Sequence, residues 1–184
     1  VYYFYAVAPM NSVDVVPATE DTAAKAGLGT INFENIDGTV DLLYAAQQAV
    51  DAPALGQAKT VMLTFNHLLS KVKFTFTNGF TNDNAYIDVK NVRMTAPETA
   101  TATLAAENSW ANQAGEITLA FGDACAKTPA GKTQVAADER LTIPAGAEQK
   151  YTVTFDVALY MGDVVAYEAK DKTATIEGVA LEIG

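Results

Sequence analysis

The feature that most constrains this chain is an alternation of apolar and polar residues with a period of two. Its longest run spans residues 151–159, where the apolar members are Tyr151, Val153, Phe155, Val157 and Leu159. Successive side chains of a β-strand point to opposite faces of a sheet, so this run predicts a strand with one buried face and one wetter face. A shorter run at residues 117–121 follows the same rule. The pattern therefore indicates β-structure.

The alternation changes parity at two places along the chain. Apolar residues occupy odd positions in residues 61–65 and even positions in residues 72–76. Because a slip of one residue would turn the apolar set outward, residues 66–70 are expected to hold a bulge, a turn or a crossing between sheets. A second change, between residues 87–89 and 92–94, predicts another bulge near Lys90 and Asn91.

Turn-forming residues separate the expected strands, at residues 78–79, 82–84, 122–123, 144–146 and 161–163. About ten short strands with this punctuation are typical of an all-β sandwich. Helix is scarce. Two short helical connectors are expected, at residues 19–26 and 44–50, each too short to be stable in isolation.

The composition of the sequence changes at residues 97–115, where Ala, Thr, Asn and Glu dominate and no hydrophobic periodicity is visible. We interpret this stretch as a linker. It divides the chain into an N-terminal β-sandwich at residues 1–106 and a smaller C-terminal β domain at residues 107–184, whose end is expected to be truncated. A single continuous sandwich with a long surface loop is the alternative.

Charge excludes several classes of partner. The chain of 184 residues has 22 acidic and 12 basic residues, a net charge of −10. That sign is wrong for neutralising phosphates or anionic lipids, so nucleic acid and membrane surfaces are not expected partners. No stretch has the roughly 18 to 20 uninterrupted apolar residues of a membrane span, so the mature form is not expected to cross a membrane.

The parts needed for catalysis or metal binding are scarce. The single His67 is expected to be buried and structural, and the single Cys125 to be an inert thiol, because no basic neighbour lowers its pKa. Residues 35–41 place oxygen ligands at alternate positions, as a calcium loop does. The twelfth position is Ala46, where that loop needs a bidentate Glu, so a β-turn at Asp37 and Gly38 is expected instead. We expect no catalytic residues, no metal and no cofactor.

Aromatic residues raise two further questions. Trp110 lies in a polar segment, where it either anchors the linker to a domain or stacks on a sugar ring. The first eight residues are apolar at every position, which suits a central strand or a strand that meets another chain. The chain is therefore expected to be a processed piece of a longer precursor, and a last strand is expected at residues 179–183.

Three segments carry a family resemblance. They are the aromatic opening strand that ends in Ala8-Pro9, the run Asp41-Leu42-Leu43-Tyr44-Ala45, and the run from Val61 to Phe74, which contains Phe65, His67 and Ser70-Lys71-Val72. Together they resemble the fimbrillin-like, or Mfa-like, proteins of Bacteroidales, which are subunits of type V pili. Weaker similarity at residues 87–92 and 141–146 extends the match over most of the chain.

The resemblance implies a pair of transthyretin-like (Greek-key) β-sandwich domains, exported as a lipoprotein precursor to the outer membrane and assembled on the cell surface. It brings no catalytic residues, and Cys125 does not match the family's lipidated cysteine. Two functions remain open. One is a fimbrial subunit or tip adhesin that assembles with other pilus subunits by donor-strand exchange. The other is a non-polymerising surface module that binds glycan or host protein.

Two sets of site residues follow from the resemblance. Tyr2, Tyr3, Phe4 and Tyr5 are expected to line an acceptor groove that a partner subunit's strand fills. Thr22, in Asp21-Thr22-Ala23, looks like the acceptor of the O-glycans that exported Bacteroidales proteins receive. The family's terminal strand is expected beyond Ile183, which leaves open whether this chain itself donates a strand.

Overall fold

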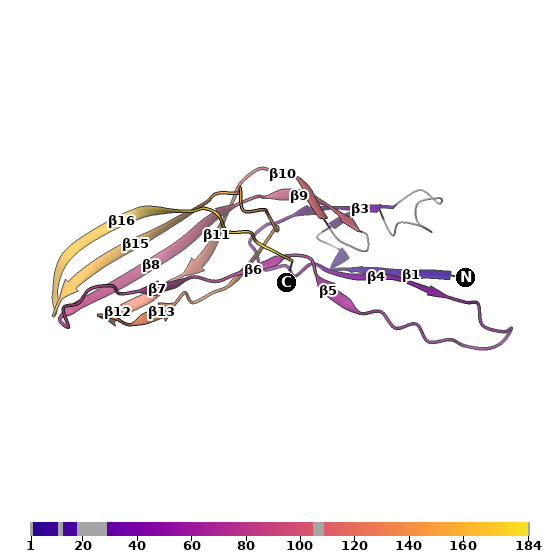
Figure 1. The fold of residues 1–184 in the computed structure, drawn as a ribbon, viewed down its shortest axis with the longest axis horizontal. Helices are drawn as coiled ribbons and strands as arrows, with labels where there is room; N and C mark the ends of the chain where they lie inside the picture. Colours follow the sequence, from indigo (N-terminus) through magenta and orange to yellow (C-terminus); the bar gives the residue numbers. More distant parts are fainter. Residues whose placement is uncertain (1, 11–12, 18–28, 105–108, 184) are drawn as a thin grey trace.

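The protein is an elongated all-β molecule, as a computed structural model shows (Figure 1). The structure describes residues 2–10, 13–17, 29–104 and 109–183. The N-terminal strand lies toward one end of the long axis, and the turn between the last two strands lies at the other. Within these residues the regular elements are strands, so the predicted fold class is confirmed.

One half of the molecule, here called the first sandwich, contains two antiparallel sheets. The first sheet has the order β1 (Tyr2–Ala8), β4 (Leu43–Val50), β5 (Phe65–His67). The second has the order β10 (Ser109–Ala114), β9 (Thr99–Leu104), β3 (Gly29–Glu34), β2 (Val13–Pro17). Side chains from both sheets meet in one core, including Ile31, Phe33, Tyr44 and Leu104.

The other half, here called the second sandwich, is built on longer strands. Its main sheet has the order β11 (Ile117–Gly122), β8 (Ala85–Ala96), β15 (Tyr151–Met161), β16 (Val164–Ile176), and β12 (Cys125–Pro129) also pairs with β8. Two short pairs accompany it: β7 (Thr75–Thr77) with β13 (Thr133–Val135), and β6 (Ser70–Val72) with β14 (Arg140–Thr142). Edge-to-face contacts of Phe74 with Phe121 and of Phe76 with Phe155 hold its core.

The clearest sequence predictions are confirmed. The two alternating runs at residues 117–121 and 151–159 form β11 and most of β15. The predicted bulge is present at Asn91, which has a φ of 51° and lies where the pairing of β15 with β8 shifts register. Its side chain donates a hydrogen bond of 2.6 Å to Asp156 on β15, which holds the irregular backbone in place.

The first parity change is a crossing between the two sandwiches. β5 ends at His67 in the first sandwich, β6 begins at Ser70 in the second, and Leu68 and Leu69 between them are buried. The prediction of a strand at residues 61–65 is wrong for all but Phe65. The pairing of β4 with β5 covers only three residue pairs, so among the residues that the structure describes no neighbouring strand completes a ladder at residues 61–64.

The predicted helix at residues 44–50 is wrong, because this segment is β4. Its backbone pairs with β1 along nearly its whole length, and Tyr44 and Ala45 are buried, so tertiary contacts override a weak helical preference. The other predicted helix, at residues 19–26, lies outside the described residues. The expected last strand at residues 179–183 is reduced to one bridge, between Leu181 and Ala145.

The predicted linker at residues 97–115 is wrong, because it contains the paired strands β9 and β10. Its apolar stripe consists of Ala100, Ala102 and Leu104, which are buried between exposed or half-buried Thr residues. Alanine and threonine differ little in hydrophobicity, so the alternation with a period of two is not visible in the sequence of this segment. The division into domains at residues 1–106 and 107–184 stays a prediction, and the pairing of β9 with β10 crosses it.

Candidate functional site

The predicted acceptor residues lie on an outer strand of the first sandwich. β1 pairs with β4 from Tyr2 opposite Val50 to Ala8 opposite Leu43. Among the residues that the structure describes, no strand pairs with the other edge of β1. A free edge presents unpaired N–H and C=O groups, which are a template for another strand.

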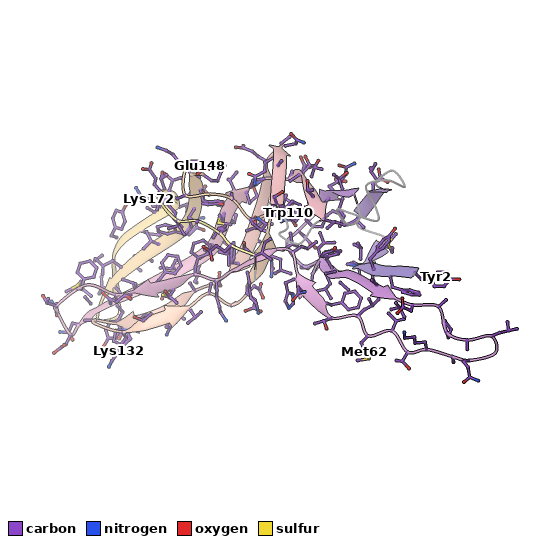
Figure 2. All side chains as sticks on the ribbon, turned by 45° about the vertical axis from the view of Figure 1, so that its right-hand side comes forward. Tyr2, Met62, Trp110, Lys132, Glu148 and Lys172 are labelled. Atoms are coloured by element: carbon purple, nitrogen blue, oxygen red, sulfur yellow. The ribbon has the colours of Figure 1, made fainter. Side chains whose placement is uncertain are left out.

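Side chains of β1 are exposed although they are aromatic. The exposed fractions are 59% for Tyr2, 39% for Phe4 and 44% for Tyr5. Figure 2 places Tyr2 at the outer end of the first sandwich, far from Lys132 in the second. Edge strands are usually protected by charge, proline or cover, whereas β1 carries no charged residue. That these side chains and Tyr3 line a groove stays a prediction.

A tight turn after β3 joins the two sandwiches. The buried Asn35 accepts a hydrogen bond of 2.8 Å from Gly38 N through Oδ1, and its Nδ2 donates one of 3.1 Å to the carbonyl of Leu141 on β14. The Leu141 N–H in turn donates to the carbonyl of Gly38. Gly38 has a φ of 74°, a conformation that glycine adopts without strain.

Residues 36–38 form a bend at the position of the predicted β-turn, and the Asn35 side chain closes it. The hydroxyl and the backbone N–H of Thr39 both donate to Asp37, and they lower the pKa of that carboxyl. Within the described residues there is no group of three or more His, Cys, Asp or Glu side chains that could hold a metal ion.

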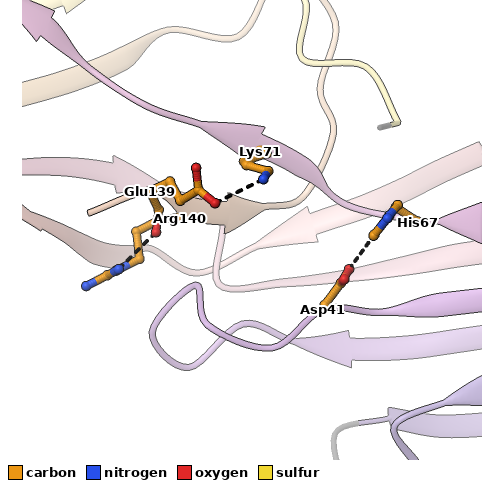
Figure 3. A network of polar contacts seen from close by, with 5 residues as sticks. All are labelled: Asp41, His67, Lys71, Glu139 and Arg140. Atoms are coloured by element: carbon orange, nitrogen blue, oxygen red, sulfur yellow. Dashed lines mark hydrogen bonds and ion pairs between the residues drawn. The ribbon is translucent and has the colours of Figure 1, made fainter. Parts of the chain in front are cut away.

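His67 is not buried, so the prediction for this residue is wrong. Its side chain is 55% exposed, and Nδ1 lies 2.8 Å from Oδ1 of Asp41 (Figure 3). The reason is its place at the end of β5, an outer strand of the first sheet. Both residues line a pocket of about 440 Å³ whose other lining groups include Lys71, Glu139 and Arg140.

The charges around this pocket are already paired within the protein. Lys71 Nζ donates to Glu139 at 2.9 Å and lowers the pKa of that carboxyl, and Arg140 binds Asp138 at 3.2 Å. These ion pairs are exposed and are worth little individually. The charged groups of this pocket are therefore already partnered, and Leu69 and Leu141 line it as well.

Trp110 anchors β10 to the first sandwich. Its Nε1 donates a hydrogen bond of 2.9 Å to the carbonyl of Leu68, and its ring makes an edge contact with Phe33 at a centroid distance of 6.0 Å. Of the two roles weighed for this residue, the structure supports the anchor. Trp110 also borders a pocket of about 740 Å³ whose lining combines polar side chains, among them Asn112, Gln113, Glu148 and Gln149, with apolar ones such as Leu181 and Ile183.

Cys125 is a buried free thiol in the second sandwich, and burial raises its pKa, as expected for an unreactive cysteine. Thr22, the predicted glycan acceptor, lies outside the described residues. Of the sequence-predicted site, the described residues show one feature, the free edge of β1.

No helix in the described part of the chain has the length and apolar character needed to cross a membrane.

Comparison with known proteins supplies the remaining observation. The sequence model of the fimbrillin-like family matches residues 1–183, nearly the whole chain. No curated protein and no solved structure matches it. The extent of this match and the all-β architecture agree, and we conclude that the chain belongs to the fimbrillin-like family, a family of structural pilus subunits.

Proposed function

We propose that this protein is a cell-surface fimbrial subunit or tip adhesin that assembles by donor-strand exchange, with β1 lining the acceptor site. The observation that carries the proposal is the state of β1. It is hydrogen-bonded to β4 on one edge, uncharged, and exposes aromatic side chains. A strand from another subunit satisfies the free backbone groups and covers the aromatic rings by β-augmentation.

The free energy of burying several large side chains would stabilise such a joint. Burying an aromatic or large aliphatic side chain contributes roughly 1.5 to 3 kcal/mol. Several such contacts outweigh the estimated 4 to 15 kcal/mol cost of lost translational and rotational freedom only when the added strand is long or ordered beforehand. The seven residues of β1 provide a ladder of useful length.

Export follows from the same family assignment. We place the mature protein at the cell surface in a fimbrium, derived from a lipoprotein precursor of the outer membrane, with other pilus subunits as partners. Thr22 is the proposed site of O-glycosylation. An intact mass of protein from its native host that equals the mass of the polypeptide would reject the glycan.

The assembly proposal is tested by placing a charge in the site. Phe4→Asp or Tyr5→Asp is expected to leave the precursor secreted and folded but to abolish polymers of the mature protein, seen by electron microscopy. Leu55→Asp is the matched control, because Leu55 is fully exposed on the loop between β4 and β5. Normal polymers from the Phe4 and Tyr5 variants would reject β1 as the acceptor.

A second candidate function has one observation in its favour. The pocket of about 740 Å³ beside Trp110 combines an aromatic edge with amide and carboxylate side chains, a composition suited to sugar hydroxyls. In this alternative the protein is a non-polymerising surface module that binds glycan or host protein. Binding to a glycan array by protein that stays monomeric, lost on Gln149→Ala, would favour it.

A further inference from the structure

The connection between β4 and β5 is long for two strands that pair directly with each other. It spans residues 51–64, and residues 51–60 are all exposed. Figure 1 shows this loop projecting from the first sandwich past the outer end of β1. Hairpin loops usually have about 2 to 5 residues, and much longer loops in compact domains are often functional. The length and exposure of this loop therefore indicate a role beyond joining two strands.

The backbone of the returning half of the loop is unbonded. The Gln57 N–H donates a hydrogen bond of 2.9 Å to the carbonyl of Ala54, which closes a turn at Leu55 and Gly56. After that turn, residues 58–63 make no hydrogen bond within the part of the chain that the structure describes. Peptidases bind their substrates as extended segments by strand addition, and exposed loops are preferred sites of cleavage. Residues 58–63 have the conformation that a peptidase requires.

Lys59 is the charged residue of this half of the loop. It is fully accessible between Ala58 and Thr60, and residues 60–64 separate it from β5. Among the described residues its ammonium group has no ion-pair partner. A peptidase whose specificity pocket holds a carboxylate selects a cationic side chain at the bond it cleaves. The side chain and the backbone at Lys59 are thus both available to an enzyme of this class.

The other basic residues of the described chain are less accessible to a peptidase. Most lie within strands: Lys71, Lys90, Arg93, Lys127, Arg140, Lys170 and Lys172. Lys73 lies between β6 and β7, and Lys150 directly precedes β15. The Lys132 N–H donates to the carbonyl of Pro129, and the Lys132 carbonyl accepts from the Asn78 N–H. Cleavage at any of these places requires local opening of paired backbone first.

A cut after Lys59 would leave the two pieces associated. β3, before the cut, pairs with β9, after it, over six residue pairs. Phe33 and Tyr44 of the first piece share one buried core with Leu68 of the second. None of these contacts depends on the loop, so the cut chain is expected to keep its fold.

We propose that the peptide bond between Lys59 and Thr60 is a processing site for a lysine-specific peptidase. Water is the second reactant. The C–N bond breaks, Lys59 gains a carboxylate and Thr60 gains a free amino group. The product is a two-chain protein of residues 1–59 and 60–184. This inference goes beyond the role proposed for β1 and does not depend on it, because neither β1 nor a second subunit takes part.

The first test treats the folded protein briefly with a lysine-specific endopeptidase. Lys25 lies outside the described residues, so a Lys25→Gln background keeps every remaining lysine within them. We expect two fragments on a denaturing gel, a new N-terminus at Thr60, and one peak of unchanged size in gel filtration. Lys59→Gln is expected to abolish both fragments. Thr60→Pro, which keeps the lysine but removes the N–H of the cleaved bond, is expected to resist cleavage too.

Lys132→Gln is the matched control, because it removes a lysine from a turn of the second sandwich and should leave the cut unchanged. A first cut at any other lysine, or equal cleavage of Lys59→Gln, would overturn the site. Separation of the fragments in gel filtration would overturn the two-chain product.

The second test examines protein isolated from its native host. N-terminal sequencing is expected to find chains that begin at Thr60. Recovery of chains that are all continuous through Lys59 and Thr60 would overturn the processing. Phe4→Asp and Tyr5→Asp are expected to be cleaved like the parent protein, so a failure of the acceptor proposal and a failure of this one are distinguishable.

Discussion

The two sandwiches use the same alternation of side chains but complete their sheets to different extents. In the second sandwich, β8 pairs with β11, β12 and β15, and β15 pairs with β16 along most of its length. In the first sandwich, β4 pairs with β5 over only three residue pairs, and β1 is bonded on one edge. Regions with fewer internal hydrogen bonds open more readily. The sheet of β1, β4 and β5 is thus less completely paired than the main sheet of the second sandwich, although the pairs β6 with β14 and β7 with β13 in that sandwich are as short as β4 with β5.

The outer strands of the two sandwiches, β1 and β16, also differ in composition. β1 is aromatic and unprotected, whereas β16 confines its apolar residues to one end and carries charges beyond them. Between the two sandwiches, a joint made by Asn35, Gly38 and Leu141 links the turn after β3 to β14. We expect the second sandwich to be the more stable half and this joint to couple it to the first.

The largest effect is expected in the core of the second sandwich. Phe121 is fully buried and contacts Phe74 at a centroid distance of 4.7 Å. Phe121→Ala is expected to lower the free energy of unfolding by about 3 to 5 kcal/mol, through lost burial and a cavity. Urea titration followed by circular dichroism measures it. Phe80→Ala, at a residue 48% exposed, is the control. Equal losses from both variants would contradict the assignment of this core.

The joint is tested with a pair of glycines. A Cβ at Gly38 would lie 3.0 Å from Arg140 Cβ and from the carbonyl of Leu141, whereas Gly56 has a similar φ and open space around it. Both alanine variants carry the cost of a positive φ, about 1 to 2 kcal/mol. Gly38→Ala is expected to cost about 1 to 3 kcal/mol more, because of the crowding. Hydrogen exchange should then show the added exposure at β14 and residues 35–41 only in the Gly38 variant.

A smaller effect is expected from the anchor of β10. Trp110→Phe keeps a ring against Phe33 but removes the donor to the carbonyl of Leu68. The loss of one hydrogen bond is expected to lower the free energy of unfolding by about 0.5 to 1.5 kcal/mol. Thermal unfolding of the variant beside Trp110→Ala measures it. If the two variants were equally unstable, packing of the ring would contribute nothing.

The smallest effect concerns pH. Hydrogen bonds from the Asp171 N–H and from Asn91 lower the pKa of Asp156 in the second sandwich, and those from Thr39 lower the pKa of Asp37 near the joint. A carboxyl with a lowered folded pKa stabilises the fold above its unfolded pKa, about 3.9. This contribution is lost as the pH falls through the folded value.

Stability measured between pH 5 and pH 2 should therefore fall less steeply in Asp156→Asn and in Asp37→Asn than in the parent protein. The change is expected to be small for both, because Asp37 is exposed to solvent and Asp156 is only half-buried. His67→Gln serves as the control, because its contact with Asp41 is exposed. An unchanged slope in both Asn variants would show that these hydrogen bonds do not persist in solution.

The sequence by itself determined the fold class and the strands with strong contrast between their faces. Residues 117–121 and 151–159 alternate large apolar side chains with Thr, Ala or Asp, and this contrast is a local property that needs no knowledge of neighbours. The bulge at Asn91 could be predicted for the same reason, since a change of parity is visible along one strand. The family could be recognised because the resemblance depends only on the order of residues within short runs.

Only the tertiary structure decided which strands are neighbours and which edges stay free. β9 was missed because its buried stripe is mostly alanine, and β4 because its strand form depends on pairing with β1. The exposure of His67 depends on its place at the end of an outer strand beside Asp41. The free edges of β1 and β16 are set by the order of the sheets. The alternation of side chains shows which face of a strand is buried. The edges of a strand pair through backbone N–H and C=O groups, which are the same in every residue except proline, so the sequence does not show which edges pair.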